Sequence, residues 1–349
     1  MNSMIRQYGA RAARLIFSLL IVCSATTAWG DAPQQTPSIF APASTPANTI
    51  FHLSLFVLGI TGGIFVVVGG LLTFALIRFR ARKDDDGSEP PQIYGSTQVE
   101  LAWTVIPILI VVVLFLTTAR IIFAIQDAPI PKAALEVTVV GHQFWWEYRY
   151  PKLGIVTANE LHVPLSTPDH PEPTYLHLLS ADVDHSFWVP QLAGKTDVIP
   201  NHPNETWIEP LHPGLYVGQC AQFCGIEHAK MLLRVYVDTP AQFAAWVKDQ
   251  QQPGVQDPRV AAGRQVFETH ACTNCHAIAG TAATGRFGPD LTHLASRATI
   301  ASGAVVNTPE NLREWIKDPD HFKEGVLMPA MQLSDGEIDE LVAYLDSLH

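Results

Sequence analysis

The sequence predicts a multidomain membrane protein in which a two-helix transmembrane hairpin is followed by an all-β domain and an all-α domain. Residues 51–77 and 99–125 are apolar over more than the roughly 20 residues that a helix needs to span a bilayer. Between residues 132 and 240, short alternating β-branched segments are separated by Pro and Gly, which is typical of a sandwich or barrel. Residues 257–349 place apolar side chains at helical spacing.

Length and charge limit the function classes. The chain has 349 residues, which is room for two or three domains. A hydrophobic fraction of 48% and a charged fraction of only 16% agree with membrane segments. A net charge of −11 argues against a nucleic-acid partner and favours a basic protein partner.

Residues 1–30 are typical of a signal peptide. A basic start precedes an apolar run, residues 15–22, that is too short to span a bilayer, and small residues near Gly30 suit cleavage. Cys23 would leave with this segment; lipid attachment at Cys23 is the alternative, although the bulky Val22 disfavours it. The other four cysteines form two pairs, each within its own motif, which argues for export and against a disulfide scaffold. Residues 31–48, rich in Pro, Ala, Ser and Thr, are expected to be a disordered tether.

Residues 49–126 are expected to form the transmembrane hairpin. Its central loop begins with Arg78, Arg80, Arg82 and Lys83, and the positive-inside rule places such a loop in the cytoplasm. Everything after residue 126 then faces the periplasmic side of a bacterial inner membrane. Five glycines in the first span allow close packing against a large membrane partner.

A motif of soft metal ligands lies near the end of the β domain. Cys220, Cys224, His228 and Met231 place two thiols, an imidazole and a thioether within twelve residues. Soft sulfur combined with imidazole suits copper. A second imidazole must come from elsewhere, and His185 is the best candidate. A disulfide or a zinc site are the alternatives for this loop taken alone.

A second redox motif lies in the all-α domain. Cys272-Thr-Asn-Cys275-His276 is typical of c-type haem attachment, in which both thiols bind the macrocycle and the imidazole binds iron. A thioredoxin-like pair would need a βαβ surround, which the sequence does not show. A methionine as sixth ligand would raise the haem potential, and Met328 and Met331 are the only methionines in this domain.

The segments around His185 and Cys220 together resemble subunit II of haem–copper cytochrome c oxidases. The resemblance implies a cupredoxin fold for residues 132–240. It also implies a dinuclear copper A centre (two Cu), whose ligands would be His185, Cys220, the carbonyl of Gln222, Cys224, His228 and Met231.

Residues 257–349 resemble a class I cytochrome c, in which the methionine ligand directly precedes proline; this selects Met328. In such domains the loop containing Pro289 orients the haem histidine, and His293 is expected to be structural. Nearly everything after the signal peptide resembles subunit II of a caa-type oxidase, which carries its own fused cytochrome c. The implied path runs from a soluble cytochrome c or similar donor through haem c and copper A to a haem in subunit I. Oxygen reduction and proton pumping occur there, and subunit III is a further expected partner.

The resemblance also implies roles beyond the binding of copper and haem. Glu100 matches a glutamate at the mouth of a proton path, which makes it a proton-uptake candidate. Phe144, Trp145 and Trp146 match the electron-accepting aromatic segment, in which the family normally has tryptophan at the position of Phe144. Gln222 replaces a frequent glutamate that also helps to hold magnesium, which leaves an interface magnesium site in question.

Two other functions fit parts of the pattern: a copper-A nitric oxide reductase subunit, and a membrane-tethered copper carrier, against which the haem motif argues. The copper ligands argue against subunit II of a quinol oxidase.

Residues 241–256 are expected to be a short helix and a linker whose flexible reach is about 15–20 Å. Because both joined domains are acidic, their contact is expected to be mostly apolar. Haem c is then the expected obligatory electron input to copper A.

Overall fold

The computed structural model describes residues 37–80, 89, 92, 94–126, 134–254 and 257–349. The expected signal peptide (residues 1–30), the start of the expected tether (31–36) and the loop residues Arg82 and Lys83 lie outside the described residues.

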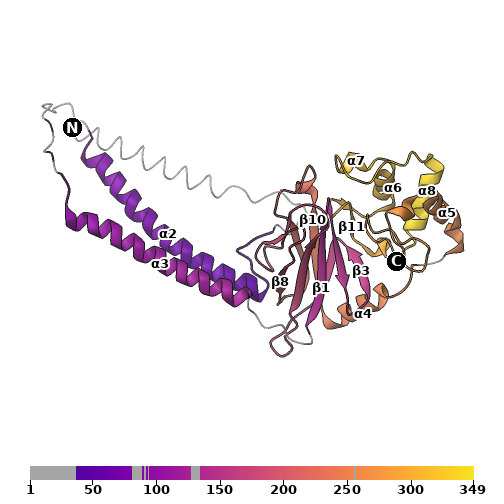
Figure 1. Ribbon diagram of the computed structural model, residues 1–349, viewed down its shortest axis with the longest axis horizontal. Coiled ribbons are helices and arrows are strands. Elements are labelled where there is room, and N and C mark those ends of the chain that lie inside the picture. Colours follow the sequence, from indigo (N-terminus) through magenta and orange to yellow (C-terminus); the bar gives the residue numbers. More distant parts are fainter. Residues whose placement is uncertain (1–36, 81–88, 90–91, 93, 127–133, 255–256) are drawn as a thin grey trace, which may run out of the picture. The chain divides into compact units, whose positions relative to one another are not determined.

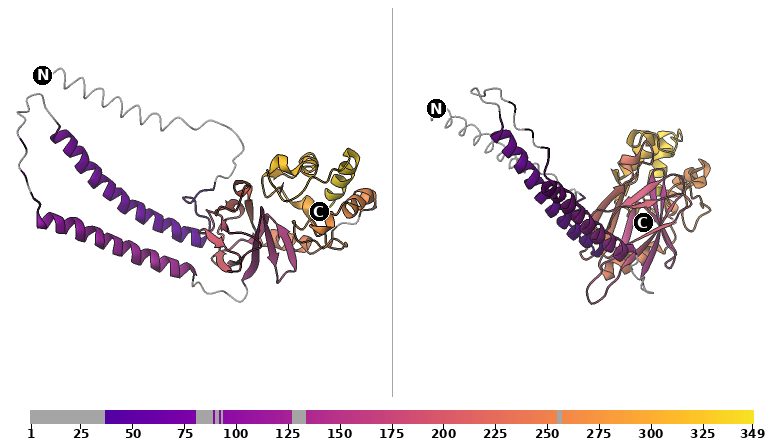
Figure 2. Two further views of the ribbon diagram at one scale, coloured as in Figure 1. Left: turned by 45° about the horizontal axis from the view of Figure 1, so that its top comes forward. Right: turned by 60° about the vertical axis from the view of Figure 1, so that its left-hand side comes forward.

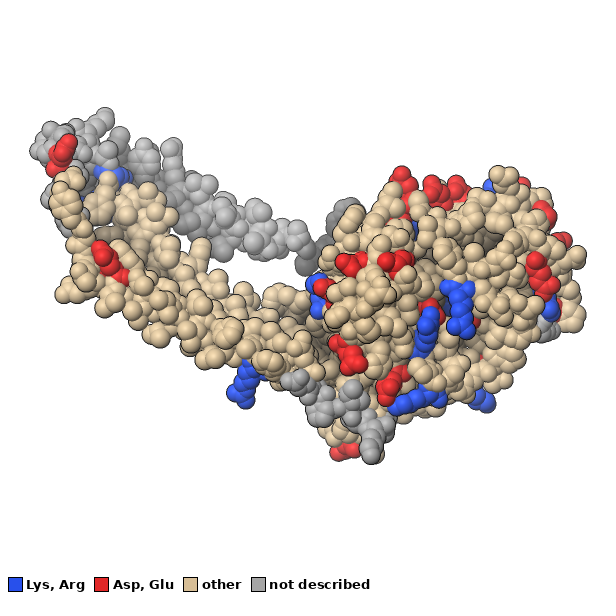
Figure 3. All heavy atoms as spheres, in the orientation of Figure 1, with Lys and Arg blue, Asp and Glu red and all other residues tan. Residues whose placement is uncertain are grey.

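Two long helices, α2 (Thr45–Arg78) and α3 (Thr97–Gln126), run side by side (Figures 1 and 2). Their most apolar windows have mean hydropathies of 2.4 and 2.8, so each can cross a membrane by length and composition. Hydroxyls of Thr61, Thr104 and Thr117 donate to the carbonyl four residues earlier, which satisfies these polar groups within the helix. Figure 3 shows that charged side chains gather on the domains that follow, while the visible surface of the helices carries few.

The described part of the expected tether is ordered, so that prediction was wrong for residues 37–48. The Ala43 N–H donates to the Gln191 carbonyl at 2.8 Å, and the Leu211 N–H donates to the Ala43 carbonyl at 2.8 Å. Ser44 is fully buried and pairs with Pro210. Small Ala and Ser side chains let the backbone approach the β domain closely, which composition alone did not reveal.

The β domain consists of two five-stranded sheets packed face to face (Figure 1). The first has the order β3-β2-β1-β5-β8, with strands β1 (Leu135–His142), β2 (Trp145–Tyr150), β3 (Ile155–Ala158), β5 (Thr174–Ser180) and β8 (Asn204–Ile208). The second has the order β4-β10-β9-β6-β7, with strands β4 (Glu160–Pro164), β6 (His185–Trp188), β7 (Thr196–Val198), β9 (Gly214–Cys220) and β10 (Leu232–Asp238).

Alternation along the strands builds the core between these sheets. On β2, Trp146, Tyr148 and Tyr150 are fully buried, because residues two apart point to the same face. Strand β9 ends at Cys220 and β10 begins at Leu232 in antiparallel register. The intervening residues, with the 3₁₀ turn η1 (His228–Lys230), are therefore held at one end of the sandwich.

Helix α4 (Pro240–Gln250) follows, with Thr239 as a reciprocal N-terminal cap. The next residues are hydrogen-bonded to both neighbouring domains. The Gln251 side chain donates to the Leu153 carbonyl at 2.8 Å, and the Gly254 N–H donates to the Ala279 carbonyl at 2.9 Å. The described part of the linker is thus fixed at both ends, in contrast to the flexible tether that its composition predicted.

The C-terminal domain is built from helices around its own apolar core, which includes Phe267, Leu312, Ile316 and Leu341. Its elements are η2 (Pro258–Val260), α5 (Ala261–Thr269), η3 (Cys272–Asn274), η4 (Leu294–Ser296), β11 (Thr299–Ile300), β12 (Val305–Val306), α6 (Pro309–Lys317), α7 (Pro319–Phe322) and α8 (Asp335–Leu345). Helices α5 and α8 cross closely at Gly263, where a side chain would meet the Glu340 backbone. The predicted fold class, a membrane hairpin followed by an all-β and an all-α domain, is confirmed.

Candidate metal and haem sites

The loop between β9 and β10 brings the predicted soft ligands together. The Sγ atoms of Cys220 and Cys224 lie 3.8 Å apart, well beyond a disulfide bond of about 2.05 Å, and both thiols are free. The Gln222 carbonyl oxygen lies 3.2 Å from Cys220 Sγ, and Met231 Sδ lies 3.9 Å from Cys224 Sγ. Strand β6, which pairs with β9, supplies His185.

The two imidazoles flank the thiol pair. His185 Nδ1 lies 3.9 Å from Cys220 Sγ, and His228 Nδ1 lies 3.7 Å from Cys224 Sγ. The His185, Cys220 and Cys224 donor atoms all lie within 4.8 Å of one another, and all three residues are buried. Since metal–sulfur and metal–nitrogen bonds are about 2.0–2.3 Å long, atoms at these separations can share a metal ion. The donor set therefore fits soft-metal binding.

The two thiols do not ionise independently. The hydrogen-bonded contact between Cys220 and Cys224 lowers the pKa of Cys220, and His185 adds to this effect. The same contact raises the pKa of Cys224, because a second negative charge would lie beside the first. Metal binding to both sulfurs therefore releases at least the Cys224 proton.

The predicted aromatic segment lies against this loop. The Phe144 ring packs on Gly225, where a Cβ would lie 2.9 Å from two of its ring atoms, and the Gln143 side chain donates to the Cys224 carbonyl at 2.7 Å. Trp146 is fully buried, with its ring centroid 5.9 Å from that of His185. Trp145 points to the other face of β2 and stacks on His142 at 4.2 Å.

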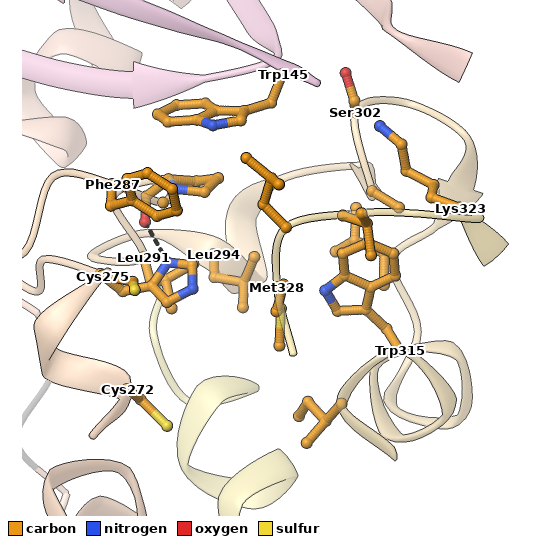
Figure 4. A pocket seen from close by; sticks show the side chains of 18 of the residues that line it. Trp145, Cys272, Cys275, Phe287, Leu291, Leu294, Ser302, Trp315, Lys323 and Met328 are labelled. Carbon is orange, nitrogen blue, oxygen red and sulfur yellow. Dashed lines mark hydrogen bonds between the residues drawn. The ribbon is translucent and has the colours of Figure 1, made fainter. Parts of the chain in front are cut away.

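A cavity of about 360 Å³ holds the second set of predicted residues. Figure 4 shows Cys272, Cys275 and Met328 around it and Trp145 of the β domain at its edge. The thiols of Cys272 and Cys275 are free. Met328 and Met331 both line the cavity, so the choice of Met328 stays a prediction.

The ring of His276 is held in place by a hydrogen bond from one of its two nitrogens. Its Nδ1 donates to the Pro289 carbonyl at 2.7 Å, which leaves Nε2 free, and burial lowers the pKa of His276 and favours the neutral ring. A Cβ on Gly288 would lie 2.6 Å from this ring, so only glycine fits there. This hydrogen bond agrees with the orienting role predicted for Pro289. His293 is buried between the carbonyls of Gln252 and His349, in agreement with a structural role.

Comparison with known proteins follows the same division of the chain. Family profiles match at residues 33–121 (cytochrome c oxidase subunit II, transmembrane domain), 168–237 (cytochrome c oxidase subunit II, periplasmic domain) and 260–349 (cytochrome c). Cytochrome c oxidase subunit 2 of Alkalihalophilus pseudofirmus is 36% identical over 314 residues, which are 88% of this chain and 89% of the relative. This chain belongs to the cytochrome c oxidase subunit 2 family.

Two further comparisons fall within the same family. Cytochrome c oxidase subunit 2 of Bacillus sp. PS3 is 35% identical over 77% of this chain and 80% of the relative. The solved periplasmic domain of subunit II from Bradyrhizobium japonicum is 30% identical over 35% of this chain and 97% of that chain, with a TM-score of 0.33. The chain is thus a membrane-anchored oxidase subunit with a periplasmic domain, an electron-input role and subunit I as a partner. Family membership implies copper A and haem c.

Arg297 adds to the fit for haem. This cavity-lining residue is 9% exposed; its Nη2 donates to the Asp290 carbonyl at 2.6 Å, and its Nε has no hydrogen-bond partner among the described residues. Haem carries carboxylates, which would satisfy such a buried guanidinium. The sequence gives no local signal for this residue.

Asp182 is a second residue that sequence reasoning missed. Its carboxylate accepts a hydrogen bond from His185 Nε2 at 2.8 Å and another from the Gln143 N–H at 2.6 Å. The first bond leaves His185 Nδ1 directed at the thiols, which is the usual arrangement of a metal-binding histidine and its outer partner. A carboxylate three residues before a candidate ligand was the available signal.

Glu100 lies apart from these sites. It is exposed in the first turn of α3, whose other end contacts the β domain through the Trp207 side chain, which donates to the Ile125 carbonyl at 2.9 Å. The two positions are separated by roughly 40 Å of helix.

The methionine choice can be tested in the holoprotein. Met328→Ala should convert the haem to a five-coordinate or high-spin form and lower its potential, because a thioether ligand raises it. Met331→Ala is the matched control and should leave the absorption spectrum and potential nearly unchanged. The reverse pattern would identify Met331 as the ligand.

Proposed function

We propose that this subunit takes electrons from a soluble cytochrome c or similar donor at haem c and passes them through a dinuclear copper A centre to the haem of subunit I, where oxygen is reduced with proton pumping. When bound, haem c and the copper centre would each supply a one-electron carrier. The protein's own contribution is to hold the two groups rigidly and to connect them.

One observation carries this proposal. Trp145 and Trp146 are adjacent on β2 and, by strand alternation, reach the two sites from opposite faces: Trp145 lines the haem cavity, and Trp146 packs edge-on against His185. Two neighbouring aromatic rings thus join the cavity to a copper-site imidazole. Phe144 offers a parallel connection through its contact with Gly225.

The proposal assigns a role to each site residue. Two coppers would be held by His185, Cys220, the Gln222 carbonyl, Cys224, His228 and Met231. Haem c would be held by Cys272, Cys275, His276 and Met328. Phe144, Trp145 and Trp146 form the electron-entry path to the copper centre. These three residues and the copper ligands belong to a copper domain at 132–240, and the haem residues belong to a cytochrome domain at 257–349.

The surroundings of the subunit complete the proposal. Both redox domains face the periplasmic side of a bacterial inner membrane, and subunit III joins subunit I as a partner. Glu100, at the opposite end of α3 from the β domain, serves proton uptake. No role is assigned to magnesium, because Gln222 offers no carboxylate.

The order of electron arrival tests the proposal. When the intact oxidase is mixed with reduced soluble cytochrome c, the haem c band should change first, and copper A should follow at a rate independent of donor concentration, because that step is internal. Stopped-flow absorption at the two bands measures this order. Copper A reduction before haem c, or at a rate that still rises with donor concentration once reduction of haem c has become saturated, would contradict it.

A further inference from the structure

Two of the buried charged side chains at the contact surface between the copper and cytochrome domains come one from each domain. Glu160 on β4 is 4% exposed and Lys323, which follows α7, is 2% exposed. Charged residues are almost never fully buried unless they have partners, so each is expected to do a specific task.

Glu160 binds backbone and hydroxyl groups of the cytochrome domain. Its carboxylate accepts hydrogen bonds from the Thr299 N–H at 2.9 Å, the Thr299 hydroxyl at 2.8 Å and the Ala298 N–H at 3.2 Å. These bonds tie β4 to β11, next to the cavity-lining residue Ile300. A carboxylate with three such donors is well satisfied, which makes its burial stable.

Lys323 makes the reciprocal contact. Its ammonium donates to the Phe144 carbonyl at 2.8 Å, and Figure 4 shows it beside Ser302 at the cavity. Lys230 of the copper-site loop donates in turn to the Phe322 carbonyl at 2.9 Å. The segment that leads from α7 to Met328 is therefore held against Phe144 and the copper-site loop of the copper domain.

A backbone pair lies on the same surface. The Leu232 N–H donates to the Ser302 carbonyl at 3.2 Å, and the Ser302 hydroxyl donates to the Leu232 carbonyl at 3.1 Å. Ser302 lines the haem cavity, and Leu232 directly follows Met231. The wall of the haem cavity is thus hydrogen-bonded to the neighbour of a candidate copper ligand.

We propose that Glu160 and Lys323 are reciprocal anchors that hold the cytochrome domain on the copper domain in one electron-transfer pose, with Lys323 as a positioning residue for transfer through Phe144. The electron passes from Fe(II) haem to oxidised copper A without a proton. This proposal rests on the proposed function but adds a fixed pose, in contrast to delivery by a swinging tether. It also replaces the expectation of a mostly apolar contact.

Hydrogen exchange in the intact oxidase tests the anchors, because the Ala298, Thr299 and Leu232 amides all donate across this surface. Lys323→Met removes the ammonium at one anchor, and the readout is hydrogen exchange of the Ala298 and Thr299 amides at the Glu160 anchor. Losing a charged hydrogen bond should shift the docking equilibrium, and hence exchange of these amides, by roughly tenfold or more. Glu160→Gln should accelerate exchange at Leu232, and Lys323→Arg, which keeps a donor, should restore most of the protection.

Lys317→Met is the matched control. This lysine is on the same domain but half-exposed, paired with Asp335, and should leave exchange at all three amides unchanged. In Lys323→Met, donor-to-haem transfer and both optical spectra should be unchanged while haem-to-copper transfer slows, a split that a purely structural defect would not produce. Unchanged exchange in both anchor variants, or an altered haem spectrum without faster exchange, would overturn the proposal. The order of electron arrival would still stand in that case.

Discussion

Replacing Cys224 with serine should abolish the copper A absorption and nearly all turnover with a soluble cytochrome donor. Cys224 lies centrally, with its Sγ 3.8 Å from Cys220, 3.7 Å from His228 and 3.9 Å from Met231. A serine hydroxyl is a hard, protonated donor and cannot replace a bridging thiolate. Because loss of an outer-shell partner alone costs roughly 10- to 100-fold in metal affinity, loss of a direct ligand should cost more.

The measurement is copper content together with steady-state oxygen consumption. Ala221→Ser is the matched control, since it adds a hydroxyl to the same loop without removing a donor, and it should retain both copper and turnover. The haem c spectrum should be unchanged in both variants. A Cys224→Ser protein with full copper content and turnover would show that this thiol is not a ligand.

Deleting residues 257–349 should leave copper A intact but remove most of the activity with a soluble cytochrome donor. The copper domain has its own core, and the candidate ligands all lie within residues 185–231. The deletion removes the proposed haem cavity, whose lining includes Phe144 and Trp145, and a fused domain gains roughly 10²- to 10⁴-fold from its high effective concentration. Turnover should therefore fall by at least tenfold.

A small-molecule reductant distinguishes loss of electron delivery from the cytochrome donor from loss of a working copper centre in the truncated oxidase. Copper A of the truncated oxidase should still be reduced by that reagent, and oxygen consumption should continue with it. If the truncated oxidase accepts electrons from the cytochrome donor as fast as the intact complex, the fused haem is an accessory and the proposed role of Phe144 is wrong.

Local signals predicted the framework of this protein well. The helices, the alternating strands and the two cysteine motifs each depend on neighbours in the sequence, so length, period and spacing were sufficient. His185, 35 residues before Cys220, was chosen because the soft-ligand motif lacked a second imidazole, and the structure brings it to 3.9 Å from that thiol.

The contacts between domains could not be predicted in the same way. Lys323 binds the carbonyl of a residue 179 positions away, and Glu160 binds groups 138 and 139 positions away. Partners that are backbone groups or an uncharged hydroxyl leave no oppositely charged residue to find in the sequence, so each of these side chains looks like an ordinary surface charge. The acidic charge of both domains led to the expectation of a mostly apolar contact. That expectation failed because a few buried charged side chains define the contact, and the summed charge of each domain does not reveal them.

The copper count and spin pattern of the intact oxidase test the central claim most directly. If Cys220 and Cys224 bridge two ions, this subunit should contain two coppers, besides any bound by subunit I, and be purple when oxidised. Electron paramagnetic resonance should then show one unpaired electron shared equally by two copper nuclei. A single zinc, a mononuclear copper pattern, or a colourless disulfide form after copper is supplied would contradict the account.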